Sequence, residues 1–110
     1  MADHPGSLEL MVLLAVLRLG EDKAYGVPIS TDIEQTTGRS VALASVYAAL
    51  ERMEERGWVS SRVGESTAER GGRAKRHFRV TTQGVRLARE AKGSLVKMWR
   101  GIRELQGGTT

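Results

Sequence analysis

Three apolar stretches with helical spacing come first along the chain, and each is followed by a glycine that can end a helix. They predict helices over residues 8–19, 27–37 and 42–56. After the third glycine the apolar period changes from helical to alternating, which predicts two strands, over residues 58–63 and 75–80. This order of elements limits the fold to a mainly helical domain with one small β-hairpin.

The first predicted helix is apolar nearly all round, because only Glu9 and Arg18 interrupt its run. Such a helix is expected to be buried in the core, and Ser7 is predicted to be its N-cap residue. The run is too short to cross a bilayer, and residues 1–7 lack the basic flank of a secretory signal. We therefore expect a soluble protein of the cytoplasm, a compartment that also fits the absence of cysteine.

From Val85 onward apolar residues recur at intervals of three and four, which is the pattern of a seam between paired helices. A helix of about 22 residues is roughly 33 Å long, so it would extend beyond so small a domain. We expect a second copy of the chain to cover the seam, so that this helix serves dimerisation. The predicted interface residues are Ala88, Ala91, Leu95, Met98, Trp99, Ile102 and Leu105.

Basic side chains are concentrated in the predicted hairpin and its loop. Residues 1–61 carry a net charge of −4, whereas residues 62–79 and residues 80–110 carry +4 each. Five cations fall within residues 70–79, more than an edge strand needs to avoid aggregation. The loop over residues 64–74 is also longer than most hairpin loops, and long loops are often functional. We therefore expect this region to contact a polyanion.

The element order indicates a winged helix-turn-helix, in which the third helix enters the DNA major groove and the hairpin loop reaches the neighbouring backbone. The predicted fold class is therefore mainly α with a small β-hairpin. It comprises a winged helix-turn-helix domain over residues 7–84 and a long C-terminal dimerisation helix over residues 85–106. Residues 1–6 and 107–110 are expected to be disordered tails.

The third predicted helix has a face for reading DNA opposite its apolar stripe. Its N-terminal half contains no carboxylate that would repel phosphates. Taken alone, the helix also fits an ordinary amphipathic bundle helix with a solvated face. The residues predicted to share the exposed face are Ser45, Ala48, Ala49, Arg52 and Arg56, and Ala49 and Arg52 are candidates for DNA contact.

Three stretches of the sequence resemble the signature segments of PadR-type transcriptional regulators. They are residues 25–29, 45–59 and 73–84, and the resemblance covers roughly residues 8–84. The chain departs from the family pattern at Tyr25, where a histidine is usual, and in the two residues after Gly26, where an aromatic and an acidic residue are usual. The resemblance implies a homodimeric, usually repressing protein that binds a double-stranded DNA operator and dimerises through its last helix.

The resemblance also assigns residues to DNA contact. Ser45 and Tyr47 match polar groups near the start of the family's recognition helix, and Arg73, Lys75 and Arg76 match its wing cations. Two alternatives stay open from the residues themselves. Tyr47 also fits a residue at the boundary of the core, and Ser45 also fits a helix cap.

Two other classes of function compete with DNA binding. The sequence has no metal-spaced ligand pair, no nucleophile elbow and no phosphate-binding glycine loop between a strand and a helix, so we expect no enzyme, cofactor or metal site. The alternative is an interaction module whose basic last helix docks on an acidic partner or membrane surface. The small residues Ala88 and Ala91 favour close helix packing over membrane contact.

Trp99 is the one candidate for a ligand contact, because it would lie at the margin of the dimer seam. The family resemblance implies a small aromatic effector between subunits, and an indole can stack on such a molecule. Trp99 also fits a packing anchor, and this interpretation is favoured because one tryptophan does not make a pocket.

Overall fold

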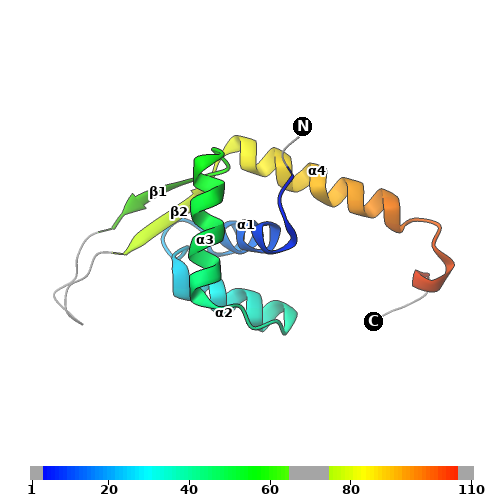
Figure 1. Cartoon of the computed structure of the whole chain (residues 1–110), viewed down its shortest axis with the longest axis horizontal. Coiled ribbons are helices and arrows are strands. Elements are labelled where there is room, and N and C mark those ends of the chain that lie inside the picture. Colours follow the sequence, from blue (N-terminus) through cyan, green and yellow to red (C-terminus); the bar gives the residue numbers. More distant parts are fainter. Residues whose placement is uncertain (1–3, 65–74, 107–110) are drawn as a thin grey trace.

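The computed structural model describes residues 4–64 and 75–106, and it confirms a mainly helical fold with one two-stranded hairpin (Figure 1). Three helices form the body, the hairpin extends from one side of it, and the last long helix extends from the other. In chain order the elements are α1 (Ser7–Leu19), α2 (Gly26–Thr37), α3 (Leu43–Glu55), β1 (Val59–Val63), β2 (Arg76–Val80), α4 (Thr82–Trp99) and the 3-10 helix η2 (Arg103–Leu105).

The N-cap of α1 is Gly6, so the prediction of Ser7 as the capping residue is wrong. Ser7 is instead the first helical residue. The reason is the carboxylate of Glu9, which accepts a hydrogen bond from the backbone N–H of Gly6 (2.9 Å). The N3 residue Glu9 thus serves the N–H of the N-cap residue, which is one half of a capping box, while Gly6 has no side chain to supply the other half.

The core lies between the three helices and the inner face of the hairpin. Its members come from every element of the body, because the apolar stripes of α2 and α3 both face α1. The largest buried side chains are Val12, Leu13, Ile29, Val46, Leu50, Met53, Trp58 and Val59.

The hairpin pairs β1 with β2 antiparallel, with Ser61 opposite Phe78. Phe78 is buried, as the alternation predicts, and its backbone N–H donates to the carbonyl oxygen of Ala24 (2.8 Å). This bond ties the hairpin to the turn between α1 and α2. The predicted basic loop covers residues 64–74, and all of it except Gly64 lies outside the described residues.

A short segment fixes the start of α4 against the corner between α3 and β1. The hydroxyl of Thr81 caps α4 by accepting from the backbone N–H of Gly84 (3.1 Å), and it donates to the carbonyl oxygen of Gly57 (2.6 Å). The carbonyl oxygen of Trp58 accepts from the backbone N–H of Thr81 (3.0 Å). Gly84 packs so closely on this carbonyl that a Cβ would overlap it. The residues 81–84 therefore act as a fixed joint.

The last long helix ends at Trp99, so the prediction of a continuous helix to residue 106 is wrong. The chain leaves the helix because Arg100 is extended and Gly101 adopts a φ of +78°, a conformation that glycine takes without strain. Ile102 and Leu105 therefore lie beyond α4. Ile102 is the residue just before η2, and Leu105 is the last residue of η2. None of the helices that the structure describes is long and apolar enough to cross a membrane.

Candidate functional site

The helix-turn-helix pair is α2 and α3, which contact each other and are joined by a short turn containing Gly38 in the left-handed conformation (φ +79°). Ser45 lies exposed in the first turn of α3. The N-cap of α3 is Ala42, so Ser45 does not cap the helix. The exposed residues of this first turn, Leu43, Ala44 and Ser45, are uncharged.

Ala49 is fully buried, so its predicted place on the exposed face of α3 is wrong. The residue lies three positions after Val46 and four before Met53, on the same stripe that packs into the core. The methyl side chain of an alanine contributes little to an apolar pattern. The sequence therefore predicts a buried stripe on α3 that is narrower than the observed one.

Arg52 points toward α1 rather than standing free on the exposed face. Its Nε donates to Oε2 of Glu9 (2.9 Å), and Nη1 of Arg56 lies 3.5 Å from the same oxygen. The Arg56 guanidinium also lies over the ring of Trp58, 5.2 Å from its centroid. Glu9 is only 7% exposed, so one nearly buried carboxylate holds both Arg52 of α3 and Arg56, the C-cap residue of that helix. Sequence reasoning missed this group because Glu9 lies 43 residues before Arg52.

The pKa of Glu9 is lowered. Burial acts to raise it, but the hydrogen bond from the Gly6 N–H and the hydrogen bond and charge of Arg52, with the charge of Arg56, together outweigh burial. A carboxyl group with a lowered folded pKa binds fewer protons in the folded state. Its contribution to stability is therefore present above the unfolded pKa and is lost as pH falls through the folded one.

We expect Glu9→Gln to lower the free energy of unfolding at pH 7 by about 1–2 kcal/mol, because the two ion pairs are lost. The loss stays this small because both arginines are about half exposed and regain water. Below the folded pKa of Glu9 the variant and its parent should be equally stable. Urea unfolding at the two pH values tests this. Glu55→Gln serves as the control, because Glu55 is exposed and has no ion pair in the described parts of the chain. An equal loss at both pH values would show that the charge of Glu9 is not what matters.

The predicted wing cations differ in their surroundings. Arg76 forms an ion pair with Glu54 of α3, and its Nε donates to the hydroxyl of Ser61 (3.0 Å), which in turn donates to Glu54 (2.6 Å). Lys75 is exposed, and its Nζ has no carboxylate partner among residues 4–64 and 75–106. Arg73 lies outside the described residues. Arg76 thus connects the hairpin to α3 through an ion pair, whereas the charge of Lys75 is not neutralised by a carboxylate of the described residues.

Tyr47 packs against the start of α2 while 41% of it stays exposed. Its phenol group covers Gly26, where a Cβ would overlap the ring and hydroxyl. This contact gives a physical reason for the glycine in the segment 25–29. Tyr47 is therefore both a boundary residue of the core and an accessible hydroxyl beside the helix-turn-helix.

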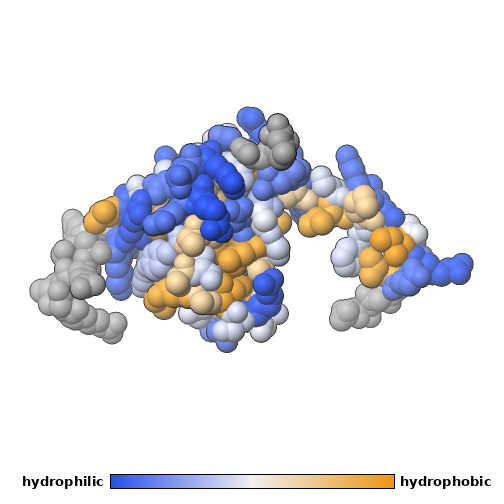
Figure 2. All heavy atoms as spheres, in the orientation of Figure 1, coloured by the Kyte–Doolittle hydropathy of each residue, from blue (hydrophilic) through white to orange (hydrophobic). Residues whose placement is uncertain are grey.

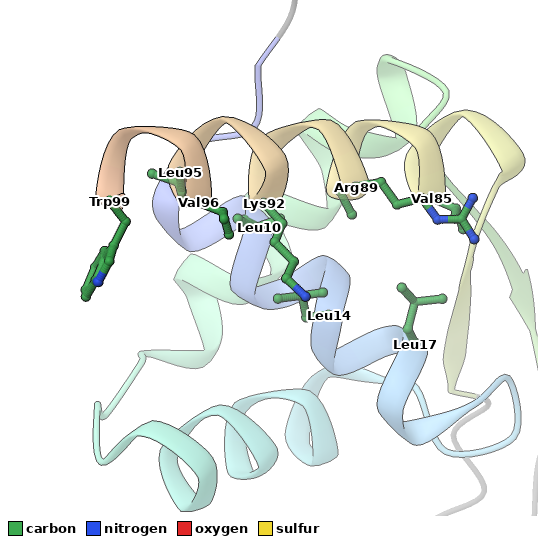
Figure 3. A pocket seen from close by; sticks show the side chains of 10 residues that line it. Leu10, Leu14, Leu17, Val85, Arg89, Lys92, Leu95, Val96 and Trp99 are labelled. Atoms are coloured by element: carbon green, nitrogen blue, oxygen red, sulfur yellow. The ribbon is translucent and has the colours of Figure 1, made fainter. Parts of the chain in front are cut away.

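An apolar groove of about 420 Å³ lies between α1 and α4 (Figure 3). Leu14 and Leu17 point from α1 toward α4 and remain exposed, so the expectation that the first helix is buried on all sides is wrong. Orange side chains along α4 mark the same apolar surface in the space-filling view (Figure 2). The other lining residues are Leu10, Val85, Ala88, Arg89, Lys92, Leu95, Val96 and Trp99.

The predicted dimer residues divide into two groups. Ala88 and Ala91 are only 8% exposed, because the chain itself covers this end of the seam. The remaining members are exposed, and Leu95 and Trp99 reach 60% each. Trp99 projects from the last turn of α4 at one end of the groove (Figure 3). The exposed group is Leu95, Met98, Trp99, Ile102 and Leu105.

Comparison with known proteins agrees with this architecture. The transcriptional regulator PadR-like family model matches residues 13–90. A transcriptional regulator from Clostridium thermocellum has the same fold, with a TM-score of 0.73 and 21% identity over 90% of this chain and 89% of that one. A PadR family regulator from Eggerthella lenta gives 0.68 and 21% over 90% and 83%.

A third structure, a PadR-like regulator from Bacillus cereus, gives a TM-score of 0.65 and 20% identity over 93% of both chains. No match to this chain is found among curated proteins. At these identities the solved structures establish the fold, and the match of the family model over most of the chain establishes the family. The chain therefore belongs to the PadR-like family of transcriptional regulators.

Proposed function

We propose that this protein is a sequence-specific DNA-binding repressor that acts as a homodimer. The observation that carries the proposal is the arrangement of α3: Ser45 and Tyr47 are exposed in its first turns, which contain no charged side chain, while Arg52 and the C-cap residue Arg56 are held by Glu9. Such a surface can approach base edges closely without binding phosphates at random. Membership of a family of transcriptional regulators supports the same function.

Ser45 is the proposed reading residue. Its hydroxyl is exposed in the first turn of α3 and forms no hydrogen bond to the described residues. A hydroxyl in that place can bond a base edge or a phosphate, and the small Ala48 on the same side can touch a thymine methyl. Tyr47 is proposed to contact the backbone beside it. Arg52, with its guanidinium on Glu9, positions α3 rather than reading bases.

The hairpin is proposed to supply affinity through the phosphate backbone. Lys75 is the cation at the loop end of the hairpin that has no carboxylate partner in the described residues, and Arg76 holds the hairpin in place through Glu54. Arg73 remains a predicted phosphate contact of the loop. Contacts of this kind strengthen binding to any duplex and make it sensitive to salt.

The exposed part of the groove between α1 and α4 is proposed as the dimer interface. Leu14, Leu17, Leu95 and Trp99 leave an apolar surface that a two-fold related α4 can cover. Dimerisation would present two copies of α3 to two half-sites. Trp99 at the end of the groove is the proposed contact for a small aromatic effector that releases the repressor from DNA.

Selection of bound sequences from random duplex DNA tests the function directly, and enrichment of a two-fold symmetric sequence is expected. Ser45→Ala should then keep the parent's melting temperature but weaken the selected operator more than random DNA, by about 1–3 kcal/mol. Gln35→Ala, an exposed change on α2, is the control that should alter neither. Failure to enrich any sequence would overturn the proposal. A lower melting temperature with normal operator binding would remove Ser45 from the reading surface.

A further inference from the structure

Tyr25, just before α2, is enclosed by two side chains from the start of β2. Nζ of Lys75 lies 4.6 Å from the centroid of the Tyr25 ring and 3.4 Å from its hydroxyl oxygen. On another side the ring of His77 meets it edge to face, with 5.2 Å between centroids. The residue therefore joins the helix-turn-helix to the hairpin, two elements that are 50 residues apart in sequence.

The cluster of Tyr25 and Lys75 has hydrogen-bond donors that lack an acceptor in the described residues. The ammonium of Lys75 donates to the phenol oxygen of Tyr25, so the phenol hydrogen and the remaining ammonium hydrogens are free to donate elsewhere. No carboxylate contacts either residue in the part of the chain that the structure describes. The cluster thus has donors and a positive charge but no internal anion.

The surroundings of Tyr25 favour an anion from outside. The backbone N–H groups at the start of α2 receive no side-chain cap, and the first turn of α2 contains no acidic residue. The hydroxyl of Tyr47 lies at Gly26, the residue next to Tyr25. The ammonium of Lys75 and the hydroxyl of Tyr25 thus lie beside the start of α2, next to the residue that the phenol of Tyr47 covers.

We propose that the hydroxyl of Tyr25 and the ammonium of Lys75 together bind one phosphate of the DNA backbone, which makes Tyr25 a further DNA-contacting residue. The inference rests on the proposed DNA-binding function. Cation–π contact with the ring holds Lys75 in place before DNA arrives, so less side-chain freedom is lost on binding. Because the contact is to a phosphate, it adds affinity without selecting sequence.

Tyr25→Phe is the test, since it removes only the hydroxyl and keeps the ring that Lys75 and His77 contact. The variant should bind the selected operator and a random duplex about three- to tenfold more weakly, with an unchanged melting temperature. Lys75→Met should weaken both duplexes and lower the salt slope by up to ~0.9. The double variant should lose less than the sum of the two single changes, because both residues serve one phosphate.

An operator with single uncharged methylphosphonate linkages identifies the phosphate itself. At one position the modified duplex should bind the parent more weakly, and Tyr25→Phe should cause no further loss there. Unchanged binding by Tyr25→Phe, a loss confined to the operator, or a lowered melting temperature would each overturn this inference while the parent still binds DNA. A parent protein that binds no duplex would instead overturn the proposed function.

Discussion

Gly84→Ala is expected to lower the free energy of unfolding by about 1–3 kcal/mol or more, a large part of the stability of a small domain. The new Cβ would meet the carbonyl group of Trp58 and lie 2.7 Å from Cγ1 of Val80. The carbonyl cannot move aside, because it accepts hydrogen bonds from the backbone N–H and the hydroxyl of Thr81. Urea unfolding measures the loss.

Gly93→Ala in the same helix is the matched control. A Cβ at Gly93 has nothing within 4 Å, and alanine favours a helix interior over glycine. The control should therefore be as stable as the parent or more stable by up to about 1 kcal/mol. If both variants behaved alike, the close packing of Gly84 on Trp58 would not be a determinant of the fold.

Leu95→Glu is expected to raise the dissociation constant of the proposed dimer by at least about 100-fold. Each copy would bring a carboxylate to the position of an apolar side chain, so two like charges would have to lose water in one two-fold interface. Operator affinity should fall with it, because a monomer reads only one half-site. Sedimentation at micromolar concentration gives the mass, and a binding titration gives the affinity.

Lys97→Glu provides the comparison on the same helix. Lys97 is exposed and does not line the groove, so a carboxylate there should leave the dimer intact. A parent protein that sediments as a monomer would contradict the dimer proposal outright. A dimer that survives Leu95→Glu would place the interface elsewhere on the chain.

The order and type of the elements followed from local patterns in the sequence. Helix ends at Gly38 and Gly57 could be predicted because both residues adopt a positive φ that glycine tolerates. The inward face of β2 followed from the alternation that buries Phe78. These features depend on neighbours a few residues apart, which one sequence displays directly.

The errors arose where small residues or distant partners decide the structure. Ala49 was placed outward because its methyl group hardly registers in an apolar period, yet it packs in the core. The seam after Trp99 continued in the sequence, but Gly101 ends the helix before the pattern does. Glu9 and Glu54 bind arginines far along the chain, and nothing local indicates such pairing.

The two tryptophans of the chain lie in opposite environments. Trp58 is fully buried at the start of the hairpin, whereas Trp99 is 60% exposed at the end of the groove. An indole in a rigid apolar surrounding emits at shorter wavelength than one in water, so the intrinsic fluorescence contains two separable signals. The blue component follows unfolding of the body, and the red component follows whatever covers α4. Each process can thus be observed in the unlabelled protein.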